Sequence, residues 1–252
     1  MDDFTRRMIM GAAGGGSKST YVDDVFNTQV YAGNGTSSHT QTTGIDMTND
    51  FLLWTKRRNS TESHYLFDSK RMSGSNYIST YSNSSALGNS RNWITAGSTG
   101  YTINDNDNAI NASGSTYASW TFRKAKGFFD VVTYTGNGSN RTISHSLGSA
   151  PGMIIIKRLD ASSDWRVYHR NTRPDTPQET SLRLNTNDAM QNGQVYFNDT
   201  FPTSSVFTVG TDSTVNANGG LYVAYIFAGG ASTAATAKSV NFDGNDYLIA
   251  PA

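Results

Sequence analysis

The feature that most constrains this chain is an internal duplication. The segment YASWTFR (Tyr117–Arg123) returns as YVAYIFA (Tyr222–Ala228), and INASG (Ile110–Gly114) returns as VNANG (Val215–Gly219), each 105 residues later. Further blocks recur in the same order, with offsets that drift between 101 and 106 residues, so the small insertions fall in loops. Five or more blocks in one order indicate two copies of a single module.

The pattern inside each copy is that of β-strands. Large apolar or aromatic residues alternate in Tyr117–Arg123, and the second copy is apolar on both sides, as expected for the central strand of a packed sheet. Gly, Ser, Thr and Asn are abundant, which favours short strands joined by tight turns. We therefore predict an all-β protein with two tandem antiparallel β-sandwich domains, jelly-roll-like in form.

Two predicted hairpins occupy the middle of the copies. FLLWTKRR (Phe51–Arg58) reads as a buried strand followed by its returning partner SHYLFD (Ser63–Asp68), and GMIIIKRL (Gly152–Leu159) is followed in the same way by DWRVYH (Asp164–His169). Each buried strand carries basic residues near its end. We interpret these residues as solvated strand ends: Lys56, Arg57, Arg58, Lys157 and Arg158.

The copies suggest four segments. Residues 1–20 form an N-terminal anchor, 21–125 the first sandwich, 126–230 the second, and 231–252 a small polar linker followed by the start of another β domain. The anchor could form one short helix with its apolar residues roughly on one face. It is interpreted either as a disordered tail or as a peg that docks on a partner through Phe4, Met8, Ile9 and Met10.

Composition excludes several classes of protein. The formal net charge is zero, which argues against a general nucleic-acid binder, and no apolar run approaches the ~20 residues of a membrane span. The chain has no cysteine and therefore no disulfide or cysteine metal site. The start is charged and runs into glycine without an apolar stretch, so no secretory signal is expected.

Several blocks carry a resemblance to a known group of proteins. YAGNG (31–35), GFFDVVTYTGNG (127–138), ISHSLGSAPGMIIIKR (143–158) and YVAYIFAGG (222–230) resemble a repeat of structural proteins from marine tailed bacteriophages, of the tail-fibre or virion-appendage type. SVNFDGNDYLIAPA (239–252) resembles the opening of a laminin-G or concanavalin-like lectin domain. The resemblance covers nearly the whole chain and implies a virion protein.

Motifs of enzyme or metal sites are weak. The four histidines His39, His64, His145 and His169 form no HExxH pattern, and no G-x-S-x-G elbow occurs. GAAGGGSKST (Gly11–Thr20) departs from the phosphate-loop pattern, because Ser17 separates the glycine from the lysine. We expect no enzyme activity, no catalytic or metal-binding residues and no cofactor.

Two polar stretches are open to a second interpretation. The run Asn104–Asn108 and the group Asp243–Asp246 offer oxygen ligands of the kind that calcium takes, yet both are also typical of turns. Aromatic residues leave a similar choice, since Trp93, Trp165 and Tyr196 could stack on sugar rings or fill a sandwich core.

These patterns predict a structural function. We expect the N-terminal part of a tail fibre or appendage, located in the virion, attached to other virion proteins such as a tail hub, adaptor or capsid, and presenting distal host-binding modules. A homotrimer is implied by the resemblance to fibres. The alternatives are a capsid decoration or head-fibre protein and a module that binds host surface glycan.

Overall fold

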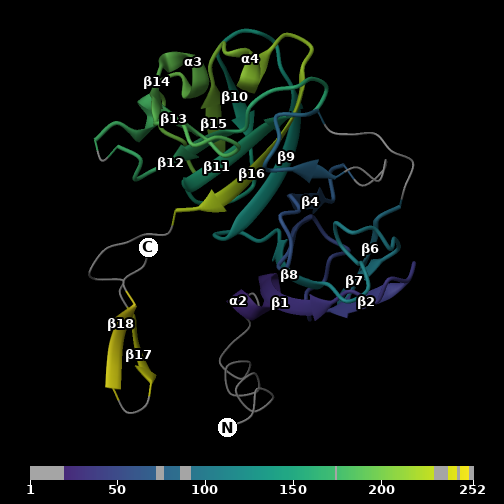
Figure 1. Cartoon of the computed structure of the whole chain (residues 1–252). Coiled ribbons are helices and arrows are strands. Elements are labelled where there is room, and N and C mark those ends of the chain that lie inside the picture. Colours follow the sequence, from purple (N-terminus) through teal and green to yellow (C-terminus); the bar gives the residue numbers. More distant parts are fainter. Residues whose placement is uncertain are drawn as a thin grey trace.

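The protein is all-β in this computed structural model, as the sequence predicts. The structure describes residues 20–71, 77–85, 92–173 and 175–229, together with the backbone of 238–242 and 245–249. Every strand pairing is antiparallel in this part of the chain. The sheets of the two copies form two adjacent groups (Figure 1).

Repeat 1, the first copy, forms two sheets. The larger has the strand order β1-β8-β3-β4-β5 and the smaller has the order β2-β7-β6. A single helical turn, α2 (Val22–Val25), precedes the first strand. The strands are β1 (Phe26–Ala32), β2 (His39–Thr42), β3 (Phe51–Arg57), β4 (His64–Asp68), β5 (Ile78–Ser79), β6 (Ile94–Gly97), β7 (Gly100–Ile103) and β8 (Thr116–Arg123).

Repeat 2, the second copy, repeats the strand order of the large sheet, with one strand added at its edge. Its large sheet has the order β14-β13-β12-β11-β16-β9, so that β9, β16, β11, β12 and β13 take the places of β1, β8, β3, β4 and β5. A second sheet pairs β10 with β15. The elements are β9 (Phe129–Thr135), β10 (Arg141–Ser144), β11 (Pro151–Arg158), β12 (Arg166–His169), η2 (Pro177–Glu179), β13 (Thr180–Arg183), β14 (Gln191–Asn192), α3 (Gln194–Phe197), β15 (Val206–Val209), α4 (Ser213–Asn216) and β16 (Leu221–Ala228).

The register of the strands repeats as well. Tyr31 lies opposite Tyr117 in the pairing of β1 with β8, and Tyr134 lies opposite Tyr222 in the pairing of β9 with β16. Strands β8 and β16 each have a neighbour on both sides, which confirms the prediction that the duplicated segment is a central strand. The predicted hairpins are confirmed as β3–β4 and β11–β12.

The recurring GNG and NASG/NANG segments contact each other in the same way in both repeats, and we call this contact the corner of the repeat. The fully buried Asn111 amide donates to Asn34 Oδ1 at 3.0 Å and to the Thr36 carbonyl at 2.8 Å. The equally buried Asn216 amide donates to the Ser139 carbonyl at 2.7 Å. A buried amide needs such partners, so these residues recur because the fold requires them.

A glycine and two tyrosines complete each corner. A side chain at Gly33 would place its Cβ 2.2 Å from the Ala112 carbonyl oxygen, and the counterpart Gly136 meets the Ala217 carbonyl oxygen at the same distance. Only glycine permits this approach of two backbones. The paired tyrosine rings described above stack at 5.1 Å in repeat 1 and 5.0 Å in repeat 2.

Three apolar clusters hold the molecule together. One lies between the two sheets of repeat 1 and a second lies within repeat 2. The third joins the repeats, because the two large sheets pack against each other through it. This shared core contains Leu52, Leu66 and Ile78 from repeat 1 and Phe129, Val131, Ile155, Trp165, Val167, Val223 and Tyr225 from repeat 2.

The ends of the chain are described only in part. Strands β17 (Lys238–Phe242) and β18 (Asn245–Ile249) form an antiparallel hairpin, which is drawn away from the repeats in Figure 1. The predicted anchor residues Phe4, Met8, Ile9 and Met10 lie outside the described residues, as does most of the predicted linker, residues 230–237.

Candidate functional site

The junction between the repeats contains a buried ion pair. Arg71 Nε donates to Asp68 Oδ2 at 2.6 Å, and the hydroxyl of Tyr225 donates to the same oxygen at 2.6 Å. Asp68 and Tyr225 are fully buried and Arg71 is nearly so. Burial raises the pKa of Tyr225 well above its usual value, so that the phenol remains a donor. Repeat 2 thus supplies a hydrogen bond to a charge that belongs to repeat 1.

A second contact is made by the end of β5 and the segment that follows it. The indole Nε1 of Trp165 donates to the carbonyl oxygens of Ser79 and Ser82 at 3.2 and 3.1 Å. Lys157 Nζ donates to the Asn83 carbonyl at 3.1 Å and to the Ser163 carbonyl at 2.7 Å. Backbone carbonyls of repeat 1 therefore satisfy buried donors of repeat 2.

The position of Lys157 corrects one prediction. We expected Lys157 to mark a solvated strand end, as Lys56 does in the first copy, but Lys157 is fully buried while Lys56 is partly exposed. Burial lowers the pKa of Lys157 to about 8, although the charge of Asp164 opposes the shift. The prediction failed because the segment after β5 covers this end of β11. A local sequence pattern cannot predict a contact between segments that lie so far apart in the chain.

An ion pair also crosses between the repeats beside β9. Lys124 Nζ lies 2.9 Å from Oδ1 of the buried Asp130 and 3.4 Å from Oδ2 of Asp50. Asp50 lies before β3 in repeat 1, whereas Asp130 lies in β9 of repeat 2. The junction therefore combines an apolar core with charged contacts, an arrangement that holds two sheets in one relative position.

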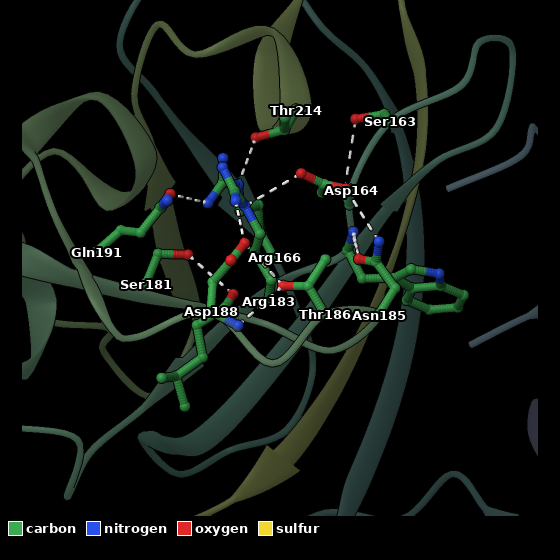
Figure 2. A network of polar contacts seen from close by, with 12 residues as sticks. Ser163, Asp164, Arg166, Ser181, Arg183, Asn185, Thr186, Asp188, Gln191 and Thr214 are labelled. Carbon is green, nitrogen blue, oxygen red and sulfur yellow. Dashed lines mark hydrogen bonds and ion pairs between the residues drawn. The ribbon is translucent and has the colours of Figure 1, made fainter. Parts of the chain in front are cut away.

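A polar network covers the outer part of β12 and β13 in repeat 2 (Figure 2). Arg183 forms ion pairs with Asp164, at 3.1 Å from Nε to Oδ2, and with Asp188. Asn185 donates from Nδ2 to Asp164 Oδ1 at 2.9 Å and accepts the backbone N–H of Trp165 at 2.9 Å. The acidic groups are thus held by side chains of the same network.

Arg166 extends the network toward the helices. Its guanidinium donates to Thr214 Oγ1 at 2.9 Å and to Gln191 Oε1 at 2.6 Å, as Figure 2 shows. The guanidinium carbon also lies 4.1 Å from the ring centroid of Tyr196, a cation–π geometry. The partners of Arg166 are thus neutral groups of α3, α4 and β14, whereas Arg183 is paired with two carboxylates.

The aromatic residues considered as sugar contacts lie in three different settings. Trp93 and Trp165 have exposed fractions of 4% and 0%, so neither ring can stack on a sugar in this structure. Tyr196 is partly buried under Arg166. The partly exposed tryptophans are instead Trp54 and Trp120, whose rings meet edge to face at 6.5 Å. The alternation of residues does not tell which face of a strand a second sheet will cover.

The histidines and the acidic run make local contacts. His64 Nδ1 accepts the indole N–H of Trp54 at 2.9 Å, and His145 Nδ1 accepts the backbone N–H of Leu147 at 3.2 Å. Asp105 and Asp107 accept backbone N–H groups two residues further along the chain, which is turn chemistry. Among the described residues, no group of three or more His, Cys, Asp or Glu could hold a metal ion.

Comparisons with known proteins add a family assignment. The family model described as "Domain of unknown function (DUF7483)" matches residues 22–245, which is most of the chain. A search of curated proteins finds no match. In the part of the chain that the structure describes, no helix is long and apolar enough to cross a membrane.

Proposed function

We propose that this chain, which belongs to the DUF7483 family of domains of unknown function, is a structural component of a bacteriophage virion. In this proposal it is the N-terminal part of a tail fibre or appendage, attached to the particle and presenting distal host-binding modules. The resemblance of the repeats to virion appendage proteins supplies the viral part of the proposal. The geometry of the junction supports the structural part.

The observation that carries the structural role is the shared core of the two large sheets. Two sandwich units joined only by a linker would rotate freely, and a fibre base built from them would transmit position poorly. Here the contact also includes the Asp68–Arg71–Tyr225 cluster, so the two units act as one block. A rigid block between an anchor and a distal module suits an appendage better than a catalyst.

The partners follow from the same proposal. The chain binds a tail hub, an adaptor or the capsid through residues 1–20 and assembles as a homotrimer. The proposed function requires neither a cofactor nor an enzymatic activity. Mass measurement of the purified protein in solution tests the trimer directly, and a monomer at micromolar concentration would remove that part of the proposal.

Microscopy of intact particles tests the viral role. Antibodies against repeat 1 should label the tail or its appendages on purified virions, and deletion of residues 1–10 should abolish this labelling while the deleted protein remains folded. Labelling over the capsid would support the decoration alternative instead. Particles without any labelling, and without the protein in their mass spectra, would contradict the proposal.

A further inference from the structure

A small open pocket lies at the edge of the large sheet of repeat 1, beside β5. Its volume is about 180 Å³, and it is lined by three tyrosines, five serines and Ile78. All of these lining residues are uncharged. The tyrosines are Tyr65, Tyr77 and Tyr81, and Tyr81 has an exposed fraction of 73%, the highest of the large hydrophobic residues that the structure describes.

This pocket occupies the position of the Figure 2 network in the other repeat. The register places Tyr65 opposite Ser79 in β4–β5 and Arg166 opposite Arg183 in β12–β13, so Tyr65 corresponds to Arg166 and Ser79 to Arg183. Two copies of one module thus differ at one place in the fold. A charged network fills it in repeat 2, and an open aromatic pocket occupies it in repeat 1.

The loops beyond these strands correspond too. In repeat 1 the backbone N–H of Ser84 donates to Ser82 Oγ at 3.0 Å, and in repeat 2 the N–H of Asp188 donates to Thr186 Oγ1 at 3.4 Å. Both pairs lie 104 residues apart in sequence, like Ser79 and Arg183. The turn is therefore retained, while Ser84 stands where repeat 2 has the acid that pairs with Arg183.

We propose that this pocket of Tyr65, Tyr77, Tyr81 and the surrounding serines binds a single neutral sugar residue of a glycan. An aromatic face offers the C–H side of a sugar ring an apolar surface, and hydroxyl groups both donate to and accept from sugar hydroxyls. A neutral lining gives no ionic attraction to a sulfated or acidic sugar. The volume of about 180 Å³ is below the ~300–1,000 Å³ of pockets that enclose drug-sized ligands, so it suits one ring.

The state of Tyr65 agrees with this chemistry. Burial, with smaller contributions from Tyr77, Glu62 and Asp107, raises its pKa to about 12. The phenol is protonated at neutral pH, as an ordinary tyrosine is, and stays so over a wider pH range. Tyr65 and Tyr77 meet edge to face at 4.7 Å, which fixes both rings at the wall of the pocket.

Saturation-transfer NMR with methyl glycosides tests the site on the full chain. The panel contains the neutral methyl glycosides of glucose, galactose, mannose, rhamnose and N-acetylglucosamine at millimolar concentration, with methyl glucuronide as an acidic probe. We expect transfer to at least one neutral glycoside and a loss of at least tenfold in affinity for Tyr81→Ala. Phe201→Ala, which removes another exposed aromatic ring in repeat 2, is the matched control and should bind normally.

A second variant imports the chemistry of repeat 2. Ser79→Arg combined with Ser84→Asp places the Arg183–Asp188 pair in repeat 1 and should close the pocket and abolish binding, with an unchanged circular dichroism spectrum. Absence of transfer to every neutral glycoside, transfer only to the glucuronide, or full binding by Tyr81→Ala would overturn the inference. None of these outcomes bears on the structural role, which fails or stands on the labelling of particles.

Discussion

The interiors of the two repeats differ more than their backbones do. On the inner face of the central strand, Ser119 and Thr121 in β8 stand where β16 has Ala224 and Ile226. Among the described residues, the hydroxyls of Ser119 and Thr121 have no hydrogen-bond partner. The corresponding cluster of repeat 2 is apolar at both positions.

The facing small sheets continue this difference. Gln41 lies opposite Tyr101 in repeat 1, and Ile143 lies opposite Phe207 at the corresponding place in repeat 2. Both residues of the first pair are buried and contribute further polar atoms without a partner within the described chain. A buried polar atom without a partner costs roughly 1–3 kcal/mol of folding free energy. The interior of repeat 1 should therefore stabilise its fold less than the interior of repeat 2 does. We infer that repeat 1 is the weaker half and relies on the junction.

The largest expected effect follows from breaking the buried pair on which repeat 1 relies. Arg71→Met leaves Asp68 buried without its cation, and we expect the free energy of unfolding to fall by about 3–5 kcal/mol. Urea unfolding measures the loss. Arg173→Met is the control, because its exposed pair with Glu179 should contribute at most about 1 kcal/mol. Similar losses for the two variants would show that the junction pair does not stabilise the fold.

Importing the interior of repeat 1 into repeat 2 should have the next largest effect. Ile226→Thr removes buried apolar surface and adds a hydroxyl without a partner, so we expect a loss of about 2–4 kcal/mol. The same urea titration measures it. An unchanged free energy of unfolding would mean that the interior of repeat 2 accommodates a polar group as readily as that of repeat 1. The inference that repeat 1 is the weaker half would then be contradicted.

The pH dependence of stability should reveal Lys157. Its folded pKa of about 8 lies below the ordinary value of 10.5, so between these values the unfolded chain binds more protons and stability rises with pH. The slope contributed by this group is at most about 1.4 kcal/mol per pH unit. Unfolding of wild type and Lys157→Met is measured between pH 7 and 11, and the stability of the wild type relative to the variant should rise between about pH 8 and 10.5. Parallel curves would contradict the assignment.

The smallest expected effect is a gain in repeat 1. Ser119→Ala installs the residue of repeat 2 and removes a buried hydroxyl without a partner, so we expect stabilisation by about 1 kcal/mol. Hydrogen exchange of amides in β8 should slow by the corresponding factor. The reverse change, Ala224→Ser, should destabilise. Destabilisation by both changes would indicate that the Ser119 hydroxyl is satisfied in solution.

The sequence predicts the repeated unit well because local patterns determine it. The apolar run on both sides of Tyr222–Ala228 identifies a central strand, and the Asn-Gly pairs at 34–35 and 137–138 lie where the chain passes from the large sheet to the small one. The sequence does not predict the shared core between the two large sheets. Alternation assigns residues such as Leu52 and Ile155 to a face of a strand, but whether that face meets solvent or another sheet depends on contacts far apart in sequence.

The candidate sites show the same limit. The sequence predicts Lys157 at a solvated strand end, and it leaves Trp165 open between a sugar contact and a core residue. Both are buried and donate hydrogen bonds to carbonyl groups of the other repeat. The pocket beside Tyr81 becomes visible only after the strand register shows which residues correspond. A comparison of the copies by sequence aligns this region loosely, because the loops differ.

Calorimetric unfolding of the whole chain at neutral pH tests the shared core most directly. If the core joins the repeats into one block, a single transition should appear, with the calorimetric enthalpy equal to the van't Hoff enthalpy. Two separate transitions, of which Ser119→Ala shifts only one, would show that the repeats unfold independently and would contradict the account.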